Sequence, residues 1–112
     1  MKLSDQVEAA TGADRGLDTA ITMEVMAGLG ADMRGKMTHA EYLAKFPGLC
    51  SEYTASLDAG LTLTPRDCHP SVILRQAIDA CIISAAMNED GEPFIERLAI
   101  FVAAAALRAR GL

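Results

Sequence analysis

Apolar residues recur at four-residue intervals in two separate stretches of this chain. They are Leu17, Ile21 and Val25 in the first stretch, and Tyr53, Leu57 and Leu61 in the second. Such spacing is typical of one side of a helix, whereas a half-buried strand would alternate apolar and polar residues. Aromatic residues make up only 4% of the chain and tryptophan is absent, so Ala, Leu, Ile, Val and Met must supply the core. The sequence therefore predicts a mostly α-helical fold.

Capping residues divide the chain into five or six helices within a single domain over residues 1–112. Side-chain oxygens at a helix start accept hydrogen bonds from the first free backbone N–H groups. A last helix is expected from Phe94 to Arg110, with Pro93 before it and Gly111 after it. The candidate caps of the earlier helices are Ser4, Asp14, Thr38 with Glu41 three residues later, and Ser51 or Thr54.

Residues 71–87 allow two interpretations. As a helix, the segment has a polar stripe in which Arg75 and Asp79 can form an ion pair four residues apart. As a hairpin, it would pair 72–76 with 81–85, but the residues between them offer no Gly, Asn or Pro for a turn. We expect a helix, with a helix–sheet–helix sandwich carrying strands around 71–87 as the alternative. The expected core is Leu17, Ile21, Val25, Leu57, Leu61, Ile78, Ile82, Leu98, Phe101 and Val102.

The charge balance argues against a nucleic-acid binder. Fifteen acidic residues against ten basic ones give a net charge of −5, whereas such binders usually carry a basic face. No apolar stretch is long and clean enough for a membrane span, and the first residues do not form a signal peptide. Three unpaired cysteines favour reduced thiols, so we expect a cytoplasmic protein.

The segment from Gly30 to Thr38 nearly matches a phosphate-binding loop. That loop needs a hydroxyl directly after its lysine to hold Mg²⁺, but Met37 follows Lys36 and Thr38 comes one residue too late. A strand should also precede it, and the preceding residues are predicted to be helical. We therefore expect a helix–helix connection and no nucleotide cofactor.

Cysteine and histidine residues give no convincing catalytic or metal site. None of them shows the short paired spacing of a zinc site, and Cys–His pairs arise by chance in any chain with such a composition. We predict no catalytic residues, no metal ligands and three free thiols. The residues in question are His39, Cys50, Cys68, His69 and Cys81.

Two groups of residues are candidates for binding a partner. The first is an acidic run, Glu89, Asp90, Glu92 and Glu96, which could dock on a basic protein surface. The second is Met33 and Met37, because flexible thioethers suit adaptable binding surfaces.

Three segments of the chain carry a resemblance to a known family. They are VEAATGADRGLDTAI at 7–21, YTASLDAGLTLTP at 53–65 and AAAALRAR at 103–110. In this order they resemble small phage and prophage proteins of alphaproteobacteria that are similar to the phage ABA-sandwich domain. The resemblance implies a helix–sheet–helix layering and an origin as a phage accessory gene, and it implies no catalytic residues.

These observations favour an interaction protein over an enzyme. The first hypothesis is an inhibitor of a host defence complex, similar to anti-CRISPR proteins, whose partner is a host protein with a basic surface such as a CRISPR effector complex. The alternative is a structural or accessory phage protein that acts as an oligomer, for example a homodimer.

Overall fold

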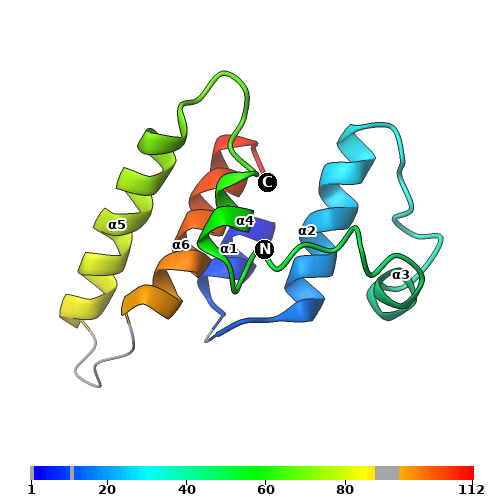
Figure 1. The fold of residues 1–112 in the computed structure, drawn as a ribbon, viewed down its shortest axis with the longest axis horizontal. Coiled ribbons are helices and arrows are strands. Elements are labelled where there is room, and N and C mark those ends of the chain that lie inside the picture. The colour runs from blue at the N-terminus through cyan, green and yellow to red at the C-terminus, as the bar shows by residue number, and fades with distance from the viewer. Residues whose placement is uncertain (1, 11, 88–93) are drawn as a thin grey trace.

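The described part of the chain forms six α-helices and no strand. The structure is a computed structural model that describes residues 2–10, 12–87 and 94–112, including all of their side chains except those of 85–87 and 94–96. The predicted mostly α-helical fold is confirmed (Figure 1). The helices are α1 (Leu3–Glu8), α2 (Arg15–Gly28), α3 (His39–Lys45), α4 (Leu57–Leu61), α5 (Pro70–Met87) and α6 (Phe94–Ala109).

Helix α6 is the centre of the fold. Every residue from Ala99 to Leu107 is buried, so this helix is covered on all sides over more than two turns. Helices α1, α4 and α5 all pack against it (Figure 1). Small residues permit the close approach: a Cβ on Gly60 of α4 would lie 3.1 Å from Cγ1 of Val102.

Residues 71–87 lie within one continuous helix, α5, so the sandwich alternative with strands in this segment is wrong. One face of α5 packs against α6. It carries three residues at intervals of four, each at most 2% exposed: Ile73, Ala77 and Cys81. The helical spacing of these buried residues, with no turn-forming residue between them, explains why the helix prevails over a hairpin.

Helices α2 and α3 form a second, smaller cluster on the side of the molecule away from α5 (Figure 1). Met23, Tyr42 and Cys50 are its buried members. The ring of Tyr42 lies against that of Phe46, with 5.2 Å between the ring centroids.

Two predicted helix caps are confirmed. The side chain of Asp14 accepts a hydrogen bond from the backbone N–H of Leu17 at the start of α2. The hydroxyl of Thr38 accepts one from the backbone N–H of Glu41 at the start of α3. Both caps are local in sequence, which is why the residue pattern alone could identify them.

Two other predicted caps are wrong. Helix α1 begins before Ser4, with Lys2 at the N-cap position, and Ser4 is buried inside the first turn. Ser56 caps α4, and neither Ser51 nor Thr54 does so. The hydroxyl of Thr54 instead makes long-range hydrogen bonds, which leave the capping position to the residue two places later.

The predicted core is correct except at Ile78 and Ile82. Ile21, Phe101 and Val102 are buried, and Leu17, Val25, Leu57, Leu61 and Leu98 pack at the edge of the core. Ile78 is half-buried and is not among the residues that pack against the core, so its assignment to the core is wrong. Ile82 is 53% exposed, so its assignment to the core is wrong. It follows the buried Cys81 directly, and one residue along a helix turns the side chain by about 100°, which carries Ile82 away from α6.

Candidate functional site

Of the two groups of residues predicted to bind a partner, the structure describes only the methionine pair in full. Glu89, Asp90 and Glu92 lie outside the described residues, in the segment that connects α5 to α6, and Glu96 is in the first turn of α6 with its side chain outside the description. Helices α5 and α2 lie on opposite sides of the molecule (Figure 1). The two methionines follow α2, whereas Glu96 lies in the first turn of α6.

Met33 and Met37 both lie in the connection between α2 and α3. Each is half-buried and packs against the cluster of Met23, Tyr42 and Cys50. Their side chains thus cover the smaller core and leave only part of their surface to a partner.

The connection from Gly30 to Thr38 follows a helix rather than a strand, and its Arg34 pairs with two carboxylates. The Arg34 guanidinium lies 2.9 Å from a carboxylate oxygen of Asp32 and 3.0 Å from one of Glu24. Hydrogen bonds from the Arg34 side chain and backbone lower the pKa of Asp32 to about 2. Since Thr38 caps α3, its hydroxyl serves the fold rather than a phosphate-bound ion.

The cysteines and histidines lie in separate surroundings. Cys50 is buried in the smaller cluster and Cys81 in the main core, while Cys68 is half-buried ahead of α5. Nδ1 of His69 accepts a hydrogen bond from the backbone N–H of Ser71. The His69 side chain thus caps the start of α5. Within the ranges that the structure describes, no three His, Cys, Asp or Glu side chains are grouped closely enough to hold a metal ion.

The thiol of Cys81 is poorly suited to nucleophilic chemistry. Burial raises its pKa, and the nearby charge of Arg97 opposes this only in part. Because the thiolate is the reactive form, a raised pKa leaves less of it at neutral pH. The position indicates a packing role for Cys81.

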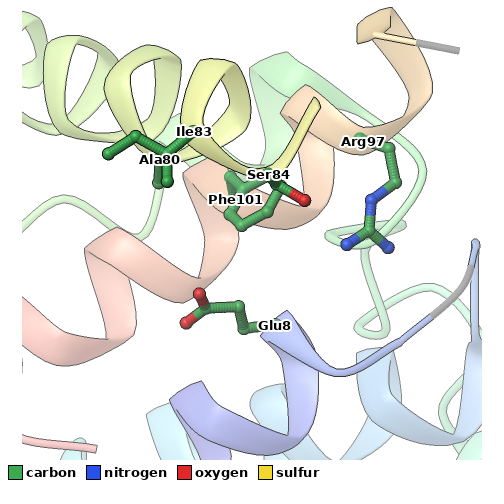
Figure 2. Close-up of a pocket in the computed structure, with 6 residues that line it drawn as sticks. All are labelled: Glu8, Ala80, Ile83, Ser84, Arg97 and Phe101. Atoms are coloured by element: carbon green, nitrogen blue, oxygen red, sulfur yellow. The ribbon is translucent and has the colours of Figure 1, made fainter. Parts of the chain in front are cut away.

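A pocket of about 470 Å³ lies where α1, α5 and α6 meet, lined by Glu8, Ala80, Ile83, Ser84, Arg97 and Phe101 (Figure 2). The Arg97 guanidinium stands over the Phe101 ring, 5.2 Å from its centroid, and donates to the carbonyl of Ala10. Glu8 is paired with Arg108. The lining contains no histidine or cysteine that could activate the hydroxyl of Ser84.

Arginine side chains bond mostly to groups of their own chain. Two of them each hold two carboxylates: Arg34 holds Asp32 and Glu24, and Arg108 holds Asp5 and Glu8. Arg15 pairs with Asp18 and donates to the carbonyl of Cys50, while Arg97 and Arg110 donate to the carbonyls of Ala10 and Leu63. Five of the seven arginines in the sequence are therefore engaged in holding the fold.

The outward face of α5 is a surface that the sequence analysis missed. Val72, Ile82 and Ile83 are 44%, 53% and 60% exposed on it. The sequence contains an indication of this surface, because Val72 and Ile82 are ten positions apart with Arg75 and Asp79 between them. It was not recognised because α5 is apolar on several sides, and the pattern alone does not show which side faces the core.

No helix within the described residues has both the length and the apolar character that crossing a membrane requires. Comparison of the chain with protein-family models, with curated proteins and with solved structures gives no match.

Proposed function

We propose that the protein acts by binding a basic partner protein through its acidic residues, as a phage-type inhibitor of a host defence complex in the host cytoplasm. The observation that carries this proposal is the placement of the arginines. Because five of the seven arginines bond to the chain's own carboxylates and carbonyls, five of the ten basic residues are left to interact with other molecules, against fifteen acidic residues in the chain.

The remaining surface charge is dominated by carboxylates. Glu52, Asp58 and Asp67 are exposed, and no side-chain contact with a described residue engages them. The run from Glu89 to Glu96 adds four acids within eight residues. Complexes that handle nucleic acids carry basic channels, and complementary charge speeds docking on such surfaces. A CRISPR effector complex is a partner of this kind.

A charge reversal tests the acidic run. The variant Asp90→Lys with Glu92→Lys is immobilised and exposed to lysate from a host that carries an active CRISPR system. We expect it to capture the effector complex more slowly than the unchanged protein, with a larger loss at low salt because screening weakens long-range attraction. The matched comparison, Glu52→Lys with Asp67→Lys, changes the net charge by the same amount outside the acidic run and should slow capture less. Equal capture by both variants and the unchanged protein would contradict the proposal.

Inhibition itself is measured by phage plating. A host whose CRISPR system blocks a phage is given the gene for this protein, and we expect plaques to return. The Asp90→Lys and Glu92→Lys variant should restore fewer plaques than the control variant. Plaque numbers that do not change when the unchanged protein is expressed would exclude inhibition of that defence system.

A structural or accessory role as an oligomer remains the second candidate. The observation that favours it is the exposed apolar face of α5, because apolar side chains gathered on one outward helix face are typical of an interface.

A further inference from the structure

The outward face of α5 is one continuous stripe. Its members are Val72, Arg75, Gln76, Asp79, Ile82 and Ile83, and every one of them is exposed. The spacing of three and four residues places them along a single side of the helix, as in the contact seam of a helix pair. This side lies opposite Ile73, Ala77 and Cys81, which face α6.

No described element of the chain covers this stripe. Helix α5 lies at the edge of the molecule, with α6 on its inner side (Figure 1). The helices that pack against α5 are α6 and α4. The stripe is therefore available to a second molecule along most of the length of the helix, which spans about 27 Å at 1.5 Å per residue.

The two charges at the centre of the stripe do not pair with any residue that the structure describes. Neither Arg75 nor Asp79 forms an ion pair or a side-chain hydrogen bond with any described residue, so the ion pair expected between them is absent. Their order along the helix is the less favourable one for such a pair, since an acid placed before a base interacts better with the helix dipole. Both charges are left to a partner.

We propose that a second copy of this chain covers the stripe, with the two α5 helices antiparallel about a two-fold axis level with Ala77. Each residue then faces the one equally far on the other side of Ala77. Arg75 faces Asp79 of the second copy, and Val72 faces Ile82 of the second copy with Ile83 beside it. The symmetry forms each of these contacts twice.

The same charges exclude the other orientation. Two parallel α5 helices would bring Arg75 against Arg75 and Asp79 against Asp79, and like charges in an interface oppose association. Exposed apolar side chains at both ends of the stripe and complementary charges at its centre thus define one register. A single helix pair is a small interface, so we expect the dimer to dissociate on dilution.

Charge-reversal variants test the proposal by sedimentation over a range of concentrations. The unchanged protein, with a mass of 11.8 kDa per chain, should pass from monomer to dimer as concentration rises. Arg75→Asp alone and Asp79→Arg alone should each weaken the dimer by about tenfold or more, because each places like charges opposite one another. Arg66→Asp, at an exposed position outside α5, is the matched control and should leave association unchanged.

Mixing the two single variants gives the sharpest readout. Arg75→Asp presents two acids and Asp79→Arg presents two bases, so an equimolar mixture should form heterodimers although each variant alone stays monomeric. Circular dichroism of each variant checks that the helices are intact. Monomer at every concentration of the unchanged protein would overturn the proposal and leave the stripe to a different partner. The proposal would also be overturned if the single variants dimerise as strongly as the unchanged protein, or if their mixture fails to associate.

Discussion

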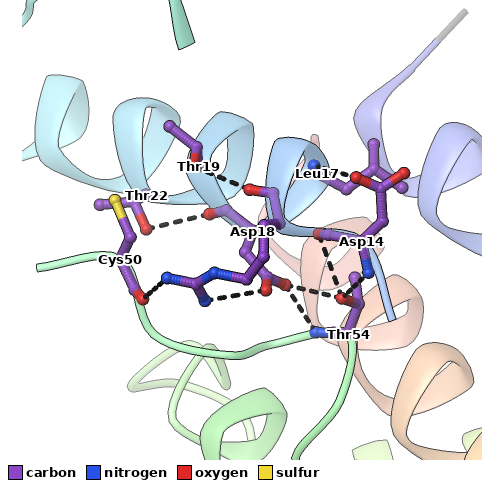
Figure 3. A network of polar contacts seen from close by, with 8 residues as sticks. Asp14, Leu17, Asp18, Thr19, Thr22, Cys50 and Thr54 are labelled. Atoms are coloured by element: carbon purple, nitrogen blue, oxygen red, sulfur yellow. Dashed lines mark hydrogen bonds and ion pairs between the residues drawn. The ribbon is translucent and has the colours of Figure 1, made fainter. Parts of the chain in front are cut away.

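Asp18 and Thr54 are joined by two hydrogen bonds across 36 residues of sequence. One carboxylate oxygen of Asp18 accepts from both the backbone N–H and the hydroxyl of Thr54, each at 2.8 Å (Figure 3). Both residues are buried. The other oxygen of Asp18 pairs with Arg15 at 3.0 Å, and the Thr54 hydroxyl accepts from the backbone N–H of Asp14. This network attaches the segment before α4 to the first turns of α2.

We expect Asp18→Ala to destabilise the fold by about 3 kcal/mol, because it leaves buried donors of Thr54 and the Arg15 charge without their acceptor. Thr54→Val keeps the shape and removes only the hydroxyl bonds, so it should cost about 1–2 kcal/mol. Urea unfolding of the two single variants and of the double variant measures the coupling between them. Asp67→Ala, at an exposed position, is the control and should change stability by less than about 0.5 kcal/mol. Additive losses would show that the two side chains act independently.

The difference between local and long-range contacts explains how much of this fold was predictable. The caps Asp14 and Thr38 could be identified because the donor and acceptor lie three residues apart. The Asp18–Thr54 bonds could not, since nothing in the sequence near Thr54 indicates that its hydroxyl points to α2 rather than to the next helix. The acidic run was identifiable from composition alone, but composition does not indicate which protein would bind it.

Which face of α5 packs against the core was also not predictable from the sequence. Side-chain size does not decide which residues of α5 are buried. The small Ala77 and Cys81 are buried, whereas the larger Ile82 is exposed. Helix α5 packs against α6, which carries alanines from 103 to 106, and small side chains allow two helices to approach closely. Size and hydrophobicity within α5 alone therefore favour the wrong side of the helix.

The contact between α4 and α6 predicts the effect of a larger residue at Gly60. A Cβ there would lie 3.1 Å from Cγ1 of Val102 and 3.4 Å from the backbone nitrogen of Ala103, so a valine side chain must push the helices apart. We expect Gly60→Val to lower the free energy of unfolding by about 1–3 kcal/mol. Gly28→Val is the control, because no atom lies within 4 Å of the Cβ position at Gly28. Thermal unfolding compares the two, and equal losses would contradict this packing argument.

The pairing of Asp32 with Arg34 predicts a pH dependence. Hydrogen bonds from Arg34 lower the pKa of Asp32 from 3.8 to about 2, so the folded loop favours the ionised carboxylate. The stabilisation is therefore fully present above pH 3.8 and is lost as the pH falls through about 2. NMR titration of the Asp32 carboxyl carbon should show this low midpoint. In Arg34→Ala the midpoint should return towards 3.8, and an equally low midpoint there would assign the shift to another cause.

The three thiols should differ in reactivity according to their burial. Cys50 and Cys81 are 4% and 2% exposed, whereas Cys68 is half-buried ahead of α5. Burial also raises the pKa of Cys81, which reduces its reactive thiolate. We expect a thiol reagent such as Ellman's reagent to modify Cys68 first in the folded protein and all three cysteines after unfolding without reductant. Cys68→Ser should remove the fast phase and leave two slow thiols. Fewer than three reactive thiols in the unfolded protein would reveal a disulfide, and a fast phase that persists in Cys68→Ser would show that one of the buried cysteines is accessible.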